Sequence, residues 1–546
     1  MLSSKLPLLT HRPLPKHGSL CCSPSTVIHL ITRDFFQAVP GSLLFHKETF
    51  LKPLVMMAAA TNMAQDSDLE ALALRVVDLE KAAAEAHQRA QELNIKGDYK
   101  AAQEAYAEMH KLEDEASQLS KQVGCVQCVL GAPTTTRPPP DGILLAVDGT
   151  AAQEGTDSSC PQYDERLIEL YSQRYMPPPW PASPPTSGTS VPGHDLSVEQ
   201  RAIGAMRGAA VADAAAMGVH WIYDLDLIRQ LETERREQGE QGLEFMNPPR
   251  SPFYTYQSGR NSPYGEQAFL LLKSLADCGG CLDCLAYAEA FSAHFGSDAF
   301  DGYRDVSCKG FLRNYSRGLL PPLTGADDAQ ANCTARLAPL VATFVGDPRL
   351  MQLVEMVTRV TQNTDAACAW ASIGAAILEG IMLGSSAEHA VRSAVHDLEQ
   401  EAGVERVEGR FKGLWGLSVK VAEELKLTLS VAESGVSVPE GVIQLGGRNC
   451  HMPNALTTPL LVVLATERKK NATQPEADFI EAIRSSLKEG GCCASRSSYV
   501  GACVGALSGV KAIPNEWSIK YLKLKELEES IERICRSRSA AATGNK

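Results

Sequence analysis

Two stretches of small residues constrain the fold of this chain more than any other feature. In each stretch the small residues recur every four positions: Gly204, Gly208, Ala212 and Ala216 in the first, and Gly501, Gly505 and Gly509 in the second. Residues four apart lie nearly above one another on a helix, so each stretch predicts a helix with a stripe that carries almost no side chain. Such stripes let helix axes approach closely, and we predict that these two helices form the centre of a bundle.

The sequence around the two stripes predicts one all-α domain over residues 198–540. Its long apolar-periodic segments are interrupted by loops rich in Gly and Pro, and alternating β-branched residues are scarce.

A helical hairpin is predicted before this domain, over residues 66–122. Apolar residues recur at alternating steps of three and four on both sides of "NIKGD", where Gly97 suits a helix end and Asp98 a helix start. Two functions stay open: the hairpin binds a protein partner or a second copy, or it packs on its own chain.

The remaining segments are predicted to lack a core of their own. Residues 123–197 are rich in Pro, Gly, Ser and Thr, which predicts a linker that is disordered in part. Residues 1–60 carry six Lys and Arg against Asp34 and Glu48. That composition is typical of an organelle transit peptide, and a start at Met56, Met57 or Met63 is the alternative. The compartment is therefore either the cytoplasm, or a plastid or mitochondrion.

The overall charge excludes some classes of partner. A formal net charge of −13 and a pI of about 5.5 argue against a general nucleic-acid or membrane-surface role. Sixteen cysteines are dilute and irregularly spaced in a chain this long, which favours free thiols in a reducing compartment.

Five segments resemble the ADP-ribosylglycohydrolase family and occur in the same order as in that family. Their sequences are most similar to those of its J1-crystallin subgroup. They are "RAIGAMRGAAVADAAAMGVHW", "CTARLAPLV", "TQNTDAACAWASIGAAILEG", "NCHMPNALTTPLLVVL" and "GGCCASRSSYVGACVGALSGVKAIPNEW". The resemblance implies an orthogonal helical bundle that binds ADP-ribose-like small molecules or ADP-ribosylated proteins and cleaves the ribosyl bond with two Mg²⁺ ions.

The resemblance fails at the expected metal ligands. The family's Thr-Asp-Asp-Thr-Gln segment corresponds to residues 263–267, where both aspartates are missing and Glu266 stands one position out of place. In the family's Gly-Gly-Asp-Thr-Asp-Thr segment the aspartate positions hold Cys492 and Ala494, and a further glutamate corresponds to His220. Mg²⁺ needs oxygen ligands, so we predict no bound metal and no other cofactor.

Four residues are the candidates for a substitute catalytic set: Asp213, His220, Glu266 and Asp365. A histidine with a pKa near neutral suits proton transfer, which makes His220 a candidate acid or base. The alternative is a hydrogen-bonded pocket histidine beside Trp221. Asp213 lies in a close-packed stripe and is expected to be buried, with Arg496 or a ligand hydroxyl as its partner.

The loop before the second stripe is a candidate anion-binding site. Its expected ligand-binding residues are Gly490, Gly491, Cys492, Ser495 and Arg496, since the glycines expose amides at a helix N-terminus and the arginine adds a cation. Cys492 and Cys493 are alternatively a nucleophile, metal ligands, or small residues left after the aspartates were lost. Cys278, Cys281 and Cys284, with Cys125 and Cys128, form a weaker candidate for zinc or an iron–sulfur cluster.

Two functions follow from these residues. The first is a protein that binds an ADP-ribosyl group without the dimetal centre. Whether such a protein also hydrolyses the ADP-ribosyl bond stays open. The second is a catalytically inactive, J1-crystallin-like protein with a structural or ligand-sensing role.

Overall fold

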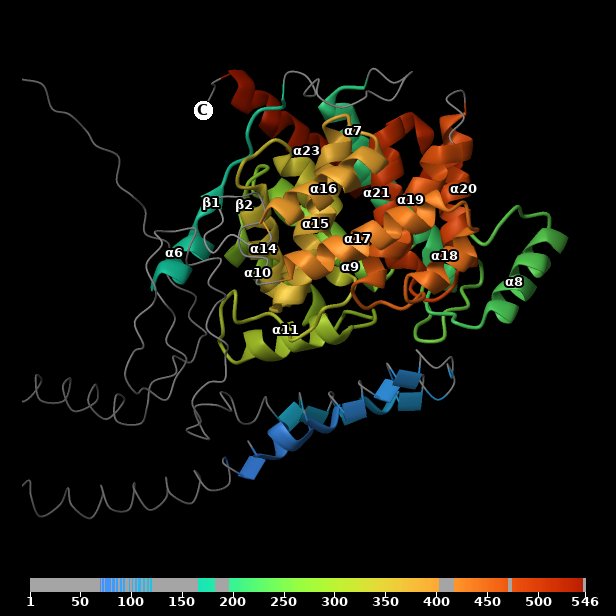
Figure 1. Ribbon diagram of the computed structural model, residues 1–546. Coiled ribbons are helices and arrows are strands. Elements are labelled where there is room, and N and C mark those ends of the chain that lie inside the picture. Colours follow the sequence, from blue (N-terminus) through green and yellow to red (C-terminus); the bar gives the residue numbers. More distant parts are fainter. Residues whose placement is uncertain are drawn as a thin grey trace, which may run out of the picture.

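The computed structural model describes residues 165–181, 196–401, 417–469 and 474–543 and, with gaps, residues 69–119. The predicted 1–60 segment, and residues 123–164 and 182–195 of the predicted linker, lie outside the described residues. The described chain is mostly helical, and its two strands have two residues each, which confirms the all-α prediction (Figure 1).

The elements before the middle of the domain are α6 (Glu165–Ser172), β1 (Arg174–Tyr175), α7 (Val198–Ala216), η1 (Met217–Val219), α8 (Leu225–Glu237), α9 (Pro263–Asp277), β2 (Leu282–Asp283), α10 (Cys284–Phe295), α11 (Val306–Ser316), α12 (Asn332–Ala335), α13 (Leu337–Phe344) and α14 (Leu350–Thr361). The rest are α15 (Asp365–Met382), α16 (Ala387–Glu401), α17 (Ser418–Glu433), α18 (Val438–Gln444), α19 (Asn454–Lys469), α20 (Pro475–Lys488), α21 (Cys493–Ser508), η2 (Val510–Ala512), α22 (Asn515–Lys520) and α23 (Leu524–Thr543).

The two glycine-striped helices, α7 and α21, pack directly on each other. A methyl group built on Gly204 would collide with the backbone carbonyl of Gly505, and one built on Gly208 would collide with that of Gly501. The reverse collisions hold for Gly501 and Gly505. Backbone therefore touches backbone along this seam, which confirms the predicted close approach of the two helices.

Local signals fix where these helices begin. Ser197 and Gln200 form a capping box at the start of α7, with the Gln200 amide donating to Ser197 Oγ at 3.2 Å. Ser262 caps α9 and is followed by Pro263 at the first helical position. These two caps set the residues at which α7 and α9 begin.

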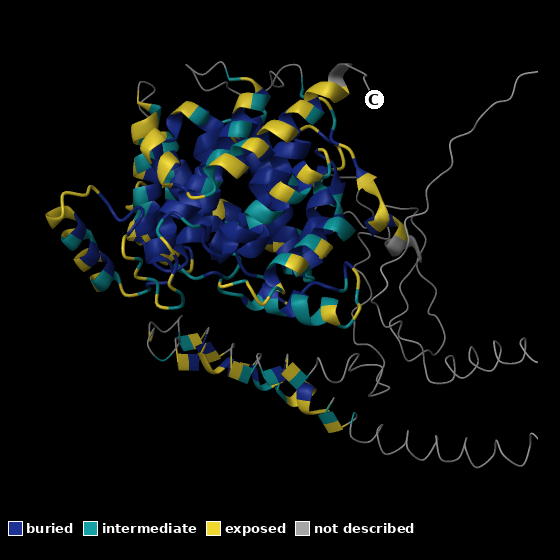
Figure 2. Ribbon diagram, turned by 180° about the vertical axis from the view of Figure 1, so that it is seen from behind, coloured by how far each residue is buried: buried dark blue, intermediate teal, exposed yellow. Residues whose placement is uncertain are grey.

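Helices α9, α13, α15, α19 and α20 are among those that pack around this pair. Figure 2 shows the buried residues concentrated in the bundle. Two helical stretches, Val198–Val219 and Asp365–Met382, are long and apolar enough to cross a membrane by length and composition. However, 83% of each apolar stretch is buried inside the domain, as in the core helix of a globular protein.

Part of the predicted linker requires correction. Residues 165–181 pack on the domain, because Leu170, Tyr171 and Tyr175 are buried and β1 pairs with β2 in antiparallel register. The proline-rich end of this segment lies against Arg538, whose guanidinium stacks 3.9 Å from the Trp180 ring. The apolar and aromatic residues among the prolines thus attach this stretch to the core.

The described residues between 69 and 119 are helical on both sides of Asp98. Arg75 pairs with Glu115 at 2.9 Å, and Arg89 pairs with Glu108 at 2.6 Å. The later residue of the first helix thus pairs with the earlier residue of the second helix. That order is the one expected of two antiparallel helices. The buried Met109 lies against Val306 at the start of α11, which places this hairpin on the domain near its aromatic loops.

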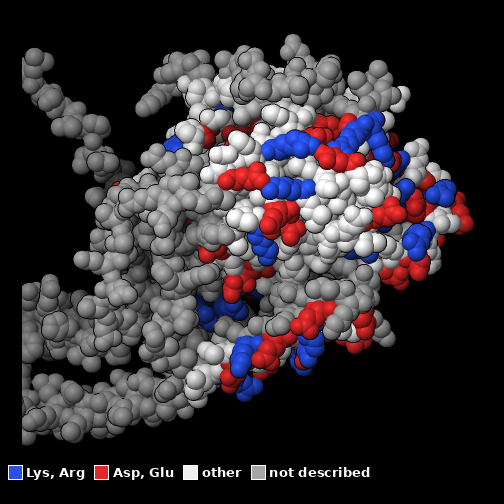
Figure 3. Space-filling view, viewed as in Figure 1, with Lys and Arg blue, Asp and Glu red and all other residues white. Residues whose placement is uncertain are grey.

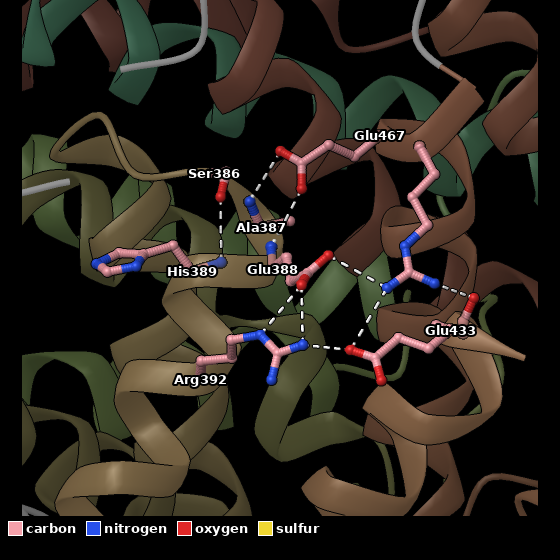
Figure 4. A network of polar contacts seen from close by, with 9 residues as sticks. Ser386, Ala387, Glu388, His389, Arg392, Glu433 and Glu467 are labelled. Atoms are coloured by element: carbon pink, nitrogen blue, oxygen red, sulfur yellow. Dashed lines mark hydrogen bonds and ion pairs between the residues drawn. The ribbon is translucent and has the colours of Figure 1, made fainter. Parts of the chain in front are cut away.

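The solvent face over α16, α17 and α19 alternates acidic and basic side chains (Figure 3). Figure 4 shows one network there, in which Arg392 donates to Glu388 at 2.9 Å and Arg468 donates to Glu388 at 3.2 Å. Glu467 accepts hydrogen bonds from the first amides of α16, Ala387 at 2.9 Å and Glu388 at 3.1 Å. This network joins three helices at the surface.

Candidate functional site

The end of α7 and the start of α21 meet through paired backbone hydrogen bonds. The Trp221 amide donates to the Gly491 carbonyl at 2.7 Å, and the Gly491 amide donates to the Ile222 carbonyl at 2.7 Å. Gly490 and Gly491 have φ values of 58° and 59°, a left-handed conformation that favours glycine. The same conformation at Trp221, with φ of 65°, is uncommon for a bulky residue.

Asp213 is fully buried near this junction, and its partners differ from the predicted Arg496. Its carboxylate accepts from the Ser262 amide at 2.8 Å, Ser262 Oγ at 2.6 Å and Asn261 Nδ2 at 2.8 Å. Burial raises the pKa of Asp213 to about 6, although the hydrogen bonds from Ser262 and Asn261 oppose that shift. Both carboxylate oxygens are thus bonded to protein donors.

His220 is also buried and does not match the expectation of a histidine titrating near neutral pH. Its Nδ1 accepts a hydrogen bond from the Ala494 amide at 3.0 Å, so the proton of the neutral ring belongs on Nε2. Burial, and then the nearby Arg496 cation, lower the pKa of His220 well below its usual value. The imidazole is therefore neutral and acts as an acceptor for the first turn of α21, as in the alternative interpretation.

Glu266 is a buried carboxylate held by two cations. Arg260 donates to it at 3.1 Å, and Lys523 Nζ lies 3.8 Å away. Its negative charge is among the causes that raise the pKa of Asp213, so the two acids are neighbours. The guanidinium of Arg260 also pairs with Asp301 at 2.9 Å and lies 4.0 Å from the Tyr256 ring.

Asp365 pairs with a different cation at the start of α15. Arg359 Nη2 donates to it at 3.1 Å, and Nε of the same arginine donates to Glu355 at 2.9 Å. Asp213, His220, Glu266 and Asp365 are all absent from the residues that line the pocket described below. Asp213 and Glu266 are neighbours, and Asp365 is held in an ion pair with Arg359.

The predicted anion-binding loop uses its donors internally. The Gly490 amide donates to Leu487, the Gly491 amide to Ile222, and the Cys492 amide to Arg448. Arg496 is buried and donates to the carbonyls of Ser486 at 2.9 Å and Gly490 at 2.5 Å. The arginine thus fixes the shape of the loop, and this geometry contradicts its expected role as a cation facing a ligand.

The two loop cysteines have different surroundings. Burial alone would raise the pKa of Cys492, but hydrogen bonds with Cys450, Ser495 and Tyr264 together lower it. Cys492 Sγ lies 2.9 Å from Ser495 Oγ. Burial raises the pKa of Cys493 to about 12, so this thiol stays protonated and packs in the core.

A cluster around Asp305 was not identified from the sequence. Its carboxylate accepts from Gln267 Nε2 and from Asn332 Nδ2, each at 2.7 Å, and from the Cys308 amide at 2.9 Å. Burial raises the pKa of Asp305, and these hydrogen bonds oppose the shift. Its position directly before α11, as the N-cap residue, was the available sequence signal.

A pocket lies between this cluster and the Trp221 junction, and its empty space, together with the open solvent at its mouth, is about 430 Å³. Aromatic rings form much of its wall, and the residues that line it are Met109, Trp221, Tyr223, Phe253, Tyr303, Asp305, Val306, Gln330 and Cys450. Cys450 Sγ donates to Gln330 Oε1 at 3.2 Å. Aromatic faces and two polar groups suit an organic ligand with a flat or apolar part.

The residues present do not fit the two Mg²⁺ ions that the resemblance implies. Asp213 is bonded by Ser262 and Asn261, Glu266 is neutralised by Arg260 and Lys523, and the loop offers thiols instead of carboxylates. Within the described parts of the chain, no group of three or more His, Cys, Asp or Glu side chains could hold a metal ion.

The cysteine run of residues 278–284 does not form such a group either. Cys281 Sγ donates to the Cys278 carbonyl at 2.9 Å, and Cys284 is fully buried in the core at the start of α10. Burial raises the pKa of all three thiols, which disfavours thiolate ligands. Cys125 and Cys128 lie outside the described residues.

Comparison with known proteins adds the following matches. A sequence model described as ADP-ribosylglycohydrolase matches residues 194–543. Crystallin J1A of Tripedalia cystophora is 27% identical over 347 residues, which cover 62% of this chain and 96% of the crystallin. Crystallin J1B of the same organism is 27% identical over 350 residues, covering 62% and 97%. A solved structure titled "ADP-ribosylglycohydrolase-related protein complex" is 20% identical, with a TM-score of 0.43, over 62% of this chain and 99% of that chain.

Proposed function

Because this chain belongs to the ADP-ribosylglycohydrolase family, we propose that it is a ligand-binding member that recognises an ADP-ribosyl group without a dimetal centre. The observation that carries this proposal is the position of the pocket. The pocket lies against the junction of α7 and α21, where the resemblance places the metal centre. Trp221 lines the pocket and also forms a backbone hydrogen bond at that junction.

The wall of the pocket supports a ribosyl or nucleotide ligand. Faces such as those of Phe253 and Tyr303 can stack on a base, which typically contributes about 1–3 kcal/mol per base. Gln330 lines the pocket, and its amide can meet a ribose hydroxyl or a base edge. Asp305 also lines it, but its oxygens already accept from Gln267, Asn332 and Cys308. The acceptor attached to the ribose, whether arginine, serine or a small metabolite, is not selected by these contacts.

The chemistry of the buried groups argues against rapid hydrolysis. Glycoside cleavage normally uses two carboxyl groups on either side of the scissile bond, or a metal that activates water. Here Asp213 and Glu266 are bonded by the protein, and His220 is neutral with a lowered pKa. Binding is therefore the function that this arrangement supports best.

Thermal shift and calorimetric titration of the full-length protein with ADP-ribose test the proposal. We expect the melting temperature to rise with ADP-ribose to the same extent in EDTA and in MgCl₂, and to stay unchanged with Mg²⁺ alone. Tyr303→Ala is expected to weaken binding about tenfold through the lost stacking surface. Tyr315→Ala removes a partly buried tyrosine that does not line the pocket and is the matched control.

Turnover of ADP-ribosylated arginine or serine provides the complementary test. We expect no cleavage above background in EDTA or in MgCl₂. Mg²⁺-stimulated cleavage, or ADP-ribose binding that requires Mg²⁺, would refute the metal-free proposal.

The second candidate function is a structural, crystallin-like protein that binds no ADP-ribosyl ligand. The observation that favours it is the similarity to two jellyfish crystallins over nearly their whole length. Under this alternative the melting temperature stays unchanged with ADP-ribose and with Mg²⁺, and no substrate is cleaved. The same titrations therefore decide between the two functions.

A further inference from the structure

Three aromatic rings in the pocket wall meet as a corner, formed by Trp221, Phe253 and Tyr303. The centroid of the Trp221 ring lies 5.2 Å from that of Phe253 and 5.1 Å from that of Tyr303, and the last two are 6.5 Å apart. The three planes are inclined to one another at 79°, 69° and 68°. We call this arrangement the aromatic corner; each of its rings stands steeply to the other two, and all three line the same pocket.

The aromatic corner is held in place by the backbone. Trp221 has a left-handed φ of 65°, and its amide donates to Gly491 at 2.7 Å. A bulky residue in this conformation costs free energy that the surrounding structure must offset, and such residues cluster at ligand sites. The paired backbone hydrogen bonds between residues 221–222 and Gly491 hold the Trp221 wall of the corner in this conformation.

The residues that line the pocket bring no cationic side chain to it. Asp305 is the ionisable acid among its lining residues, and the lining residues include neither lysine nor arginine. A neighbouring part of the same aromatic cluster already holds a cation, since Arg260 lies 4.0 Å from the Tyr256 ring. Tyr256 stacks on Tyr254 at 4.3 Å, and Tyr254 contacts Trp221 at 5.8 Å.

We infer that the aromatic corner binds a small organic cation of the quaternary-ammonium class. Such a cation has no hydrogen-bond donor to satisfy, so aromatic faces can replace its hydration through cation–π attraction. An inorganic cation is a poorer fit, because it needs free oxygen ligands and the Asp305 oxygens already accept from Gln267, Asn332 and Cys308. The inference rests on the proposed function only in placing the ligand in the same pocket.

The test is a calorimetric titration of the full-length protein with choline and with 3,3-dimethylbutan-1-ol. The two probes have the same shape, and only choline carries a charge. We expect choline to bind at least tenfold more tightly than the neutral alcohol. Phe253→Leu and Tyr303→Leu are each expected to weaken choline binding about fivefold, in the range of one cation–π contact.

Phe300→Leu is the matched control, because Phe300 is partly buried and does not line the pocket. Its affinity for choline should equal that of the unmodified protein. Equal affinity for choline and the alcohol, or no binding of choline, overturns the inference. Should Phe253→Leu fail to fold, as judged by its melting temperature, Tyr303→Leu carries the comparison.

A parallel titration with ADP-ribose separates the two proposals. Binding of ADP-ribose without binding of choline refutes the cation site and leaves the proposed function standing. Binding of choline without binding of ADP-ribose supports the cation site and refutes the proposed function.

Discussion

At the scale of single residues, Asp213 makes the stability of the protein depend on pH. Its pKa is raised from about 3.8 to about 6, so the folded state holds the proton more tightly than the unfolded state does. The stabilisation from this proton is complete below about pH 3.8 and is lost as the pH rises through about 6. A shift of this size corresponds to about 3 kcal/mol.

We expect Asp213→Asn to remove this dependence, because the amide keeps the shape and cannot ionise. Relative to the unmodified protein, the free energy of unfolding of the variant should rise by about 2.5 kcal/mol between pH 4 and pH 7. Urea unfolding at several pH values measures the difference, in which the contributions of other groups cancel. A difference that stays constant with pH would mean that Asp213 titrates as an exposed acid.

The sequence identified individual residues of the site better than their environments. Asp213 and His220 were singled out by their place in a motif, but their partners are distant in the chain. Asp213 is bonded by Ser262, and His220 by Ala494, so neither bond could be inferred from neighbours in sequence. The pKa of each group depends on burial by several helices, which a motif does not describe.

At the scale of elements, the seam between α7 and α21 tolerates no added atom. In Gly505→Ala the new methyl group would meet the Gly204 carbonyl, and neither helix can move without shifting the core. We expect a loss of about 3 kcal/mol or more in the free energy of unfolding. Denaturant unfolding monitored by circular dichroism measures the loss.

Gly380→Ala is the matched control for this substitution. It lies inside α15, and its new methyl group would meet Ala390, whose Cβ is 3.2 Å and whose Cα is 3.7 Å away. Alanine is the better helix former, so we expect a change within about 1 kcal/mol. Similar losses in the two variants would show that the seam is not the sensitive contact.

The contact between the hairpin and the domain leads to a prediction about hydrogen exchange. Met109 is buried against Val306, so Met109→Ala should loosen the hairpin and expose the start of α11. We expect amides of residues 305–308 to exchange at least fivefold faster. Leu74→Ala, at a position that is 52% exposed, should leave them unchanged. Equal exchange in both variants would place the hairpin elsewhere.

The secondary structure was easier to predict than the attachment of these elements. The small-residue stripes predicted α7 and α21 because a period of four is a local signal. The packing of Leu170 and Tyr171 was missed, since proline-rich flanks gave the whole segment the composition of a linker. The aromatic corner was missed because its rings come from separate loops.

At the scale of the whole molecule, Arg538 joins the C-terminal helix to the segment before the domain. Its guanidinium donates to the carbonyls of Pro178 at 2.9 Å, Pro179 at 3.1 Å and Val345 at 2.8 Å. Arg538→Ala leaves the buried Val345 carbonyl and the part-buried carbonyls of Pro178 and Pro179 without this donor, and we expect a loss of about 3 kcal/mol. The melting temperature measures it. Arg536→Ala, in an exposed pair with Glu532, is the control and should change stability by less than about 0.5 kcal/mol.

The seam between α7 and α21 also has a consequence for biosynthesis. The two helices are separated by about 280 residues of chain, yet each is the other's main neighbour. At ribosomal speeds of roughly 5–20 residues per second, α7 emerges roughly 15–55 seconds before its partner exists. During that interval its glycine stripe and apolar flanks face solvent, so a nascent chain stalled before α21 should be a strong client for chaperones.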